Sequence, residues 1–122
     1  MIASLLAALA LSQSPADALL ADAAQLGRDM VDVQICEVLE VGTAKGDYIT
    51  TTIESLFTRA EALQVDRNVI DNAGEEAYKA YMAELEAKHP GEPSEEAKAE
   101  LRAQCQNLLT TRPELLGAYQ AD

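Results

Sequence analysis

The sequence is poor in aromatic residues, in basic residues and in histidine. Its 122 residues include four tyrosines, one phenylalanine, one histidine and no tryptophan. Strands favour aromatic and β-branched side chains, whereas alanine, leucine and glutamate favour helices. Because the aromatic residues are scarce while alanine and leucine are prominent, the composition indicates an all-α protein.

The shortage of basic residues gives the chain a strong negative charge. Nine Lys and Arg residues stand against 21 Asp and Glu residues, which makes the formal net charge −12. Such a surface repels nucleic-acid phosphates and anionic lipid headgroups. We therefore expect no nucleic-acid partner and no membrane insertion of the mature chain, while a basic protein partner stays open. The alternative interpretation is that the charge serves solubility alone.

The N-terminal segment, residues 1–18, resembles a signal peptide in its pattern. The apolar run Ile2–Leu11 has the length of a signal-peptide hydrophobic region and is too short to span a bilayer. Ala16-Asp17-Ala18 fits the small-x-small cleavage pattern, and Ala8-Leu9-Ala10 is an earlier candidate, although no Lys or Arg precedes the run. We expect a periplasmic or secreted protein with a single helical domain over residues 19–122.

The end of the same segment also has the pattern of a helix start. Ser14 is a favourable N-cap residue, and Pro15 would occupy the first helical position. On this interpretation the segment is part of the first helix and the chain is not processed there. Both interpretations stay open at the level of the sequence.

Four segments have apolar residues at helical spacing. They predict four helices: Leu19–Val41, Tyr48–Leu63, Arg67–Lys88 and Glu95–Leu109. The glycines at the ends of 42–46 indicate a turn, and Pro113–Tyr119 is predicted to form a short terminal helix or turn. Val31–Ile35 alternates with the period of a strand, but no partner strand is evident, so we assign it to the first helix. The predicted fold is a small up-and-down four-helix bundle with a short C-terminal helix.

The two cysteines predict one covalent link. Cys36 lies on the first predicted helix and Cys105 on the last. A pair of cysteines in an exported protein is typical of a disulfide, which here would close a loop of about 70 residues and stabilise the fold by about 4 kcal/mol. The alternative is two free thiols in a cytosolic protein. The acidic neighbours of Cys36 disfavour a thiolate, so a catalytic Cys36 is not expected.

Motifs for catalysis or metal binding are scarce. Glu86-Ala-Lys-His89 is an E-x-x-H fragment, but di-iron bundles use two such motifs and this chain has a single histidine. The sequence holds no zinc, calcium, haem or nucleotide fingerprint. We therefore predict no catalytic residue, no metal ligand and no cofactor, and we expect a protein that is not an enzyme.

Two functions remain as hypotheses. The first is an exported accessory protein that binds a protein partner through its helix faces. The second is a carrier of a small apolar ligand in a cavity inside the bundle, with a slot lined by Phe57, Tyr78, Tyr81 and Met82. Phe57 is also predicted to lie at the centre of the core. An exposed apolar patch larger than about a few hundred Å² would favour the first function, and an internal void lined by these four residues would favour the second.

Overall fold

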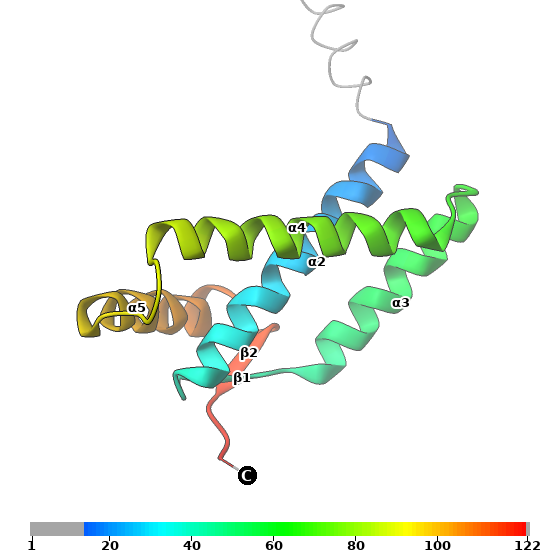
Figure 1. Ribbon diagram of the computed structural model, residues 1–122. Helices are drawn as coiled ribbons and strands as arrows, with labels where there is room; N and C mark the ends of the chain where they lie inside the picture. Colours follow the sequence, from blue (N-terminus) through cyan, green and yellow to red (C-terminus); the bar gives the residue numbers. More distant parts are fainter. Residues whose placement is uncertain (1–13, 122) are drawn as a thin grey trace, which may run out of the picture.

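The computed structural model describes residues 14–121, and the predicted hydrophobic region Ile2–Leu11 lies outside them. The fold is all-α and bundle-like, with one disulfide and a two-stranded sheet, so the predicted fold class is confirmed (Figure 1). The elements in chain order are α2 (Pro15–Val38), β1 (Gly42–Ala44), α3 (Gly46–Ala62), α4 (Arg67–Lys88), α5 (Glu95–Thr111) and β2 (Leu116–Ala118).

The first helix starts before the predicted position. The hydroxyl of Ser14 accepts a hydrogen bond from the backbone N–H of Asp17 at 3.1 Å, and Pro15 occupies the first helical position. Because this cap satisfies a backbone donor that the helix itself leaves unpaired, α2 begins at Pro15 rather than at Leu19. Leu19 is fully buried in the second turn of the helix.

The strand-like stretch Val31–Ile35 is helical, as expected. Val31 and Val33 are both buried although they lie on different sides of α2. The helix contacts α3, α4, α5 and β1, so it buries more than one face. The period-two pattern therefore reflects a central helix and not a strand.

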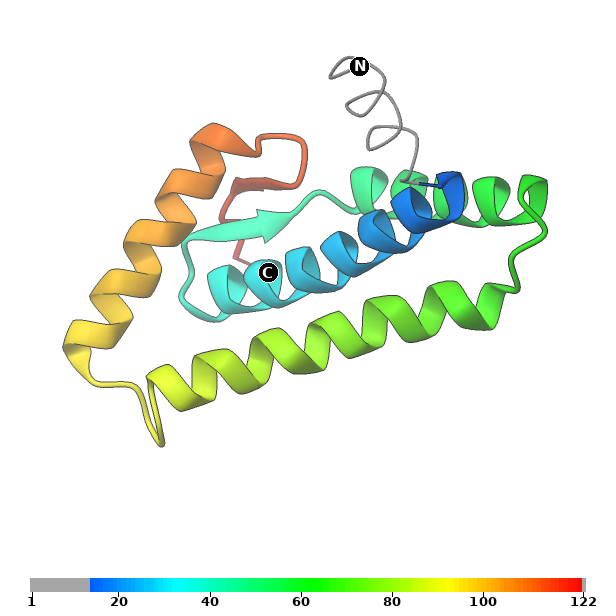
Figure 2. The same ribbon diagram turned by 90° about the horizontal axis from the view of Figure 1, so that it is seen from above.

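Helices α2 and α4 pack closely because two glycines meet where they cross. A Cβ atom on Gly27 would collide with the carbonyl oxygen of Gly74, so no larger residue fits without a backbone shift. Helix α3 forms a V with α2 that opens toward the N-terminal end of α3 (Figure 1). Helix α5 leaves the end of α4 at a steep angle (Figure 2), so it does not run alongside the other three helices.

The two short strands were not predicted from the sequence. β1 pairs antiparallel with β2, with Thr43 opposite Gly117. The segment predicted as a turn therefore contains a strand, and Pro113–Tyr119, predicted as a short helix or turn, is a turn followed by a strand. Burial of Leu115 and Leu116 holds this segment against the bundle, next to β1.

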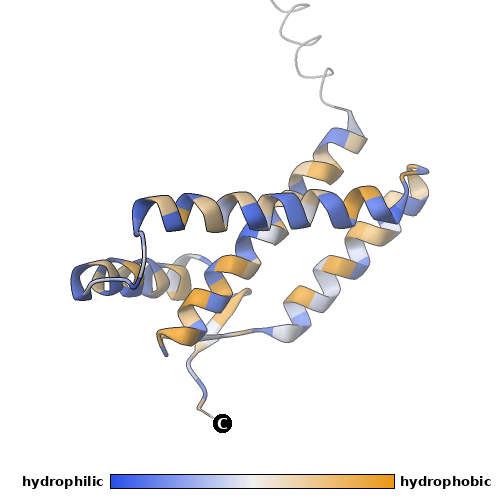
Figure 3. Ribbon diagram, in the orientation of Figure 1, coloured by the Kyte–Doolittle hydropathy of each residue, from blue (hydrophilic) through white to orange (hydrophobic). Residues whose placement is uncertain are grey.

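The core consists of two clusters. We name the first the groove-end cluster, formed by Leu19, Ala23, Leu56, Ala60 and Ile70. We name the second the disulfide-end cluster, formed by Val33, Cys36, Cys105, Leu115 and Leu116. Hydrophobic residues are more frequent along α2 and α3 than along α4 and α5 (Figure 3). Phe57 packs at the edge of the groove-end cluster and stays partly exposed, so its predicted central place was wrong; Leu56 occupies that place.

Candidate binding groove

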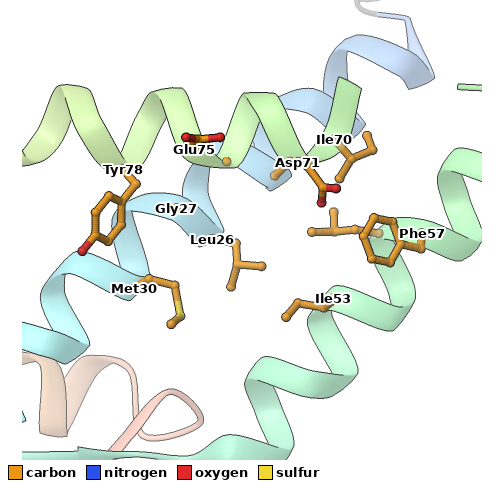
Figure 4. A pocket seen from close by; sticks show the side chains of 12 residues that line it. Leu26, Gly27, Met30, Ile53, Phe57, Ile70, Asp71, Glu75 and Tyr78 are labelled. Carbon is orange, nitrogen blue, oxygen red and sulfur yellow. The ribbon is translucent and has the colours of Figure 1, made fainter. Parts of the chain in front are cut away.

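A groove of about 390 Å³ lies between α2, α3 and α4, beside the crossing of α2 and α4 (Figure 4). On each of α2 and α3, two large side chains lie one turn apart: Leu26 and Met30 on α2, and Ile53 and Phe57 on α3. Helix α4 contributes Ile70. We name this feature the α2–α3–α4 groove; its lining is completed by Ala23, Gly27, Leu56, Asp71, Gly74, Glu75 and Tyr78.

The floor of the groove is apolar and partly adaptable. The backbones of Gly27 and Gly74 meet at the crossing, and the residues of α2 and α3 that line the groove are all apolar. Met30 has an unbranched, flexible side chain that can change its shape to suit an occupant. Ile53 is 38% exposed at the mouth of the groove, which leaves apolar surface in contact with solvent.

The polar groups of the groove lie on α4. Asp71, Glu75 and Tyr78 are four and three residues apart, which places them on one face of the helix. Glu75 pairs with Lys79 at 2.9 Å, and hydrogen bonding to Glu75 raises the pKa of the exposed Lys79 amine. The hydroxyl of Tyr78 donates to the side-chain oxygen of Gln34 at 2.5 Å. Asp71 makes no ion pair with any residue between 14 and 121.

The structure brings together two of the four residues predicted to line a ligand slot. Phe57 and Tyr78 line the groove, whereas Tyr81 and Met82 lie elsewhere. Tyr81 borders a polar cleft toward α5, and Met82 borders an apolar depression with Leu101. The four residues therefore do not share one internal void. Helical spacing placed Tyr78, Tyr81 and Met82 together on one helix. In the structure α2 crosses beneath α4, so that Tyr78 borders one depression while Tyr81 and Met82 border two others.

Tyr81 is held by a carboxylate of α2. Its hydroxyl donates to Asp32 at 2.6 Å. Burial raises the pKa of Asp32, an effect that the bond from Tyr81 opposes. Burial, followed by the bond to Asp32, raises the pKa of Tyr81, since both disfavour the phenolate. The phenol therefore keeps its proton, and the pair ties α4 to α2.

A second polar contact joins α2 to the end of α5. Asp29 is only 3% exposed and accepts hydrogen bonds from both terminal nitrogens of Arg112, at 3.2 and 2.9 Å. Gln25 donates a further bond to Asp29, and Glu114 accepts one from the Arg112 Nε. These carboxylate contacts raise the pKa of the guanidinium. Asp29 and Arg112 are separated by 83 positions in the sequence, so no local pattern predicts the pair.

A polar groove of about 360 Å³ lies between α2 and α3 and includes the Asp29–Arg112 pair. Leu26 and Leu56 line both this groove and the α2–α3–α4 groove, so these two side chains divide them. The remaining charges of the polar groove are paired, because Arg59 contacts Asp22 at 2.8 Å. Since its ions are satisfied within the protein, it is a weaker candidate for binding than the apolar groove.

The predicted disulfide between Cys36 and Cys105 is present, with the two Cα atoms 5.6 Å apart. Both cysteines are buried, which keeps the bond away from solvent thiols. Among residues 14–121, no group of three or more His, Cys, Asp or Glu side chains is placed to hold a metal ion. No helix in that range has the length and apolar character needed to cross a membrane.

The chain was compared with protein-family models, curated proteins and solved structures. None of them matches it. The shape and chemistry of its surfaces are therefore the basis on which a function can be argued.

Proposed function

We propose that this protein is an exported, non-enzymatic binding module that holds an apolar segment of a protein partner in the α2–α3–α4 groove. The groove itself carries this proposal, because it keeps an apolar surface from three helices in contact with solvent. Exposed apolar surface framed by polar residues is a common mark of an interaction site. The floor supplies contact area, while the carboxylates of α4 favour a basic partner.

Export is supported by the disulfide, since such bonds persist mainly in oxidising compartments. The start of α2 adds a constraint on processing. Cleavage after Ala18 would remove the Ser14 cap and the first turn, and Leu19 would become the new terminus. Cleavage after Ala10 would leave the cap in place. The intact mass of the protein from its own host distinguishes these two products from the full chain.

A second candidate function is the transport of a small apolar ligand. The volume of the groove falls within the range of small-molecule sites, and its few polar groups lie at one edge. Native mass spectrometry of protein from its own host tests this candidate. A bound organic molecule that is lost when the groove is blocked would support the carrier and contradict the protein-binding module.

Two matched variants test the proposed module. Ile53→Asp places a charge at the mouth of the groove, and Val69→Asp places the same charge on a residue that is 43% exposed and does not line it. A partner cross-linked in envelope extract should be identified and its affinity measured with purified components. We expect Ile53→Asp to weaken binding about tenfold, in the manner of an interface hot spot. Equal losses in both variants would overturn the proposal.

A further inference from the structure

We propose that the occupant of the α2–α3–α4 groove is an amphipathic helix of a partner protein with basic residues along one edge. This helix would pack beside α4, in the position that the fourth helix of a four-helix bundle takes and that α5 does not occupy. This inference rests on the proposed function and specifies the partner that it leaves general. Its support comes from the arrangement of the helices, from the nature of the groove floor and from the polar groups at the rim.

Within residues 14–121, the arrangement of the helices leaves one position of a bundle unfilled. Helices α2, α3 and α4 surround the groove, while α5 leaves α4 at a steep angle and packs at the disulfide end (Figure 2). The axes of α2 and α3 diverge in a V (Figure 1), and apolar residues of both helices line the groove. An added helix would bury the exposed faces of Ile53 and Met30 in the way that helices of a bundle cover each other.

The floor of the groove favours a helical occupant over an extended one. An extended peptide binds well where it adds a strand to a sheet edge, because its backbone groups then gain partners. The described lining consists of residues from three helices, whose own backbone groups are hydrogen-bonded within those helices. A helix satisfies its own backbone and can present side chains at i, i+3, i+4 and i+7 to this apolar floor.

The rim favours a basic edge because its polar groups accept hydrogen bonds. Asp71 and Glu75 are carboxylates, and the proton of the Tyr78 hydroxyl is already donated to Gln34, which leaves the lone pairs of its oxygen. These three acceptors span two turns of α4, about 10 Å along the axis. Lysine or arginine residues one turn apart on the occupant would match them, and the net charge of −12 adds long-range attraction.

Two cations of the protein, Arg67 and Lys79, limit where the basic edge can lie, and Lys79 already pairs with Glu75 at 2.9 Å. The guanidinium of Arg67 lies over the ring of Phe57, 4.7 Å from its centre. It would repel a cation at that end of the groove. The basic residues of the occupant therefore belong between these two cations, beside Asp71, which makes no ion pair with any residue between 14 and 121.

Synthetic peptides of about 14 residues, four helical turns, provide the test. One peptide carries a leucine face with lysines along one edge, the second replaces the lysines by glutamates, and the third carries a central proline that breaks the helix. Binding of the labelled peptides to the full-length protein is followed by fluorescence anisotropy. We expect the lysine peptide to bind most tightly and to bind at least tenfold more weakly to Ile53→Asp than to Val69→Asp.

Charge variants supply the second comparison. Asp71→Asn removes a rim carboxylate, and Glu76→Gln removes a carboxylate of the same helix that does not line the groove. We expect Asp71→Asn to weaken the lysine peptide about threefold, the effect of one exposed ion pair, and Glu76→Gln to change the affinity less. Equal losses in these two variants would overturn the proposed basic edge.

The remaining outcomes separate the two proposals. If the glutamate or proline peptide binds as tightly as the lysine peptide, and Ile53→Asp still abolishes binding, this inference fails while the proposed module stands. If no peptide binds, the inference fails, and the cross-linked partner decides the proposed function independently. Sedimentation that shows a dimer which Ile53→Asp dissociates would identify a second copy of the chain as the occupant and would also overturn the inference.

Discussion

The two ends of the molecule are stabilised in different ways. The disulfide-end cluster combines a covalent bond, a strand pair and the buried contact between Asp29 and Arg112. The groove-end cluster relies on close packing of small and aliphatic side chains around the crossing at Gly27 and Gly74. The strong links lie at one end, and the α2–α3–α4 groove lies at the other. The proposed binding surface therefore lies at the end of the molecule that has no covalent link.

The largest expected change is the loss of the disulfide. Replacing Cys36 and Cys105 together by alanine should lower the free energy of unfolding by about 4 kcal/mol, since the loop of 69 residues is no longer closed in the unfolded chain. Urea unfolding measures this change. If the two ends are independent, amide exchange should accelerate first in α5 and β2. Equal acceleration in α3 would contradict the comparison.

A smaller loss is expected at the helix crossing. Gly27→Ala should lower the free energy of unfolding by about 3 kcal/mol, because its Cβ collides with backbone of α4 that has to move. Gly46→Ala is the matched control: no atom lies within 4 Å of the added methyl group, and the change should be within about 1 kcal/mol of neutral. Thermal unfolding of both variants checks the difference. Similar stabilities would show that α2 and α4 can separate at little cost.

The buried ion pair is the polar link of the disulfide end. Arg112→Met leaves Asp29 buried without its cation and should destabilise the protein by about 2 kcal/mol, less than a fully buried pair because Arg112 is partly exposed. Glu114→Gln removes only an exposed contact of the same guanidinium and should cost less than about 0.5 kcal/mol. Urea unfolding of both variants is the measurement. A larger loss for Glu114→Gln would show that Asp29 contributes little.

The smallest expected effect is a pH dependence of the free energy of unfolding, which arises from the contact of Tyr81 on α4 with Asp32 on α2. The pKa of Tyr81 is raised in the folded protein, so the folded state holds this proton more tightly than the unfolded state does. The resulting stabilisation is complete below pH 10 and is lost as the pH rises above the ordinary pKa of tyrosine. Tyr81→Phe should remove this decline in urea unfolding between pH 9 and 11. An unchanged decline would assign it to other groups.

The sequence was most informative where local chemistry determines structure. The bounds of α4, Arg67–Lys88, agree with the prediction because Asp66 caps its start and Pro90 follows its end. The disulfide was predicted from the cysteine count and the helical positions. Ser14 and Pro15 gave the correct start of α2 under one of the two interpretations.

The missed features depend on contacts between distant segments. β1 and β2 have three residues each and lie more than 70 residues apart, so neither shows a period of its own. Phe57 stays partly exposed and lines the groove between α3 and its neighbouring helices, and both facts depend on how α3 is placed against α2 and α4. Helical spacing identifies an apolar face, but it does not indicate how far that face stands from the next helix.

The pairing of β1 with β2 has a consequence for the order in which the chain can fold during synthesis. All members of the groove-end cluster lie between residues 19 and 70, so they are available once a little over half of the chain has left the ribosome. Leu115 and Leu116 are among the last residues to emerge, and the disulfide-end cluster lacks them until then. The groove-end cluster can therefore form before the disulfide-end cluster is complete.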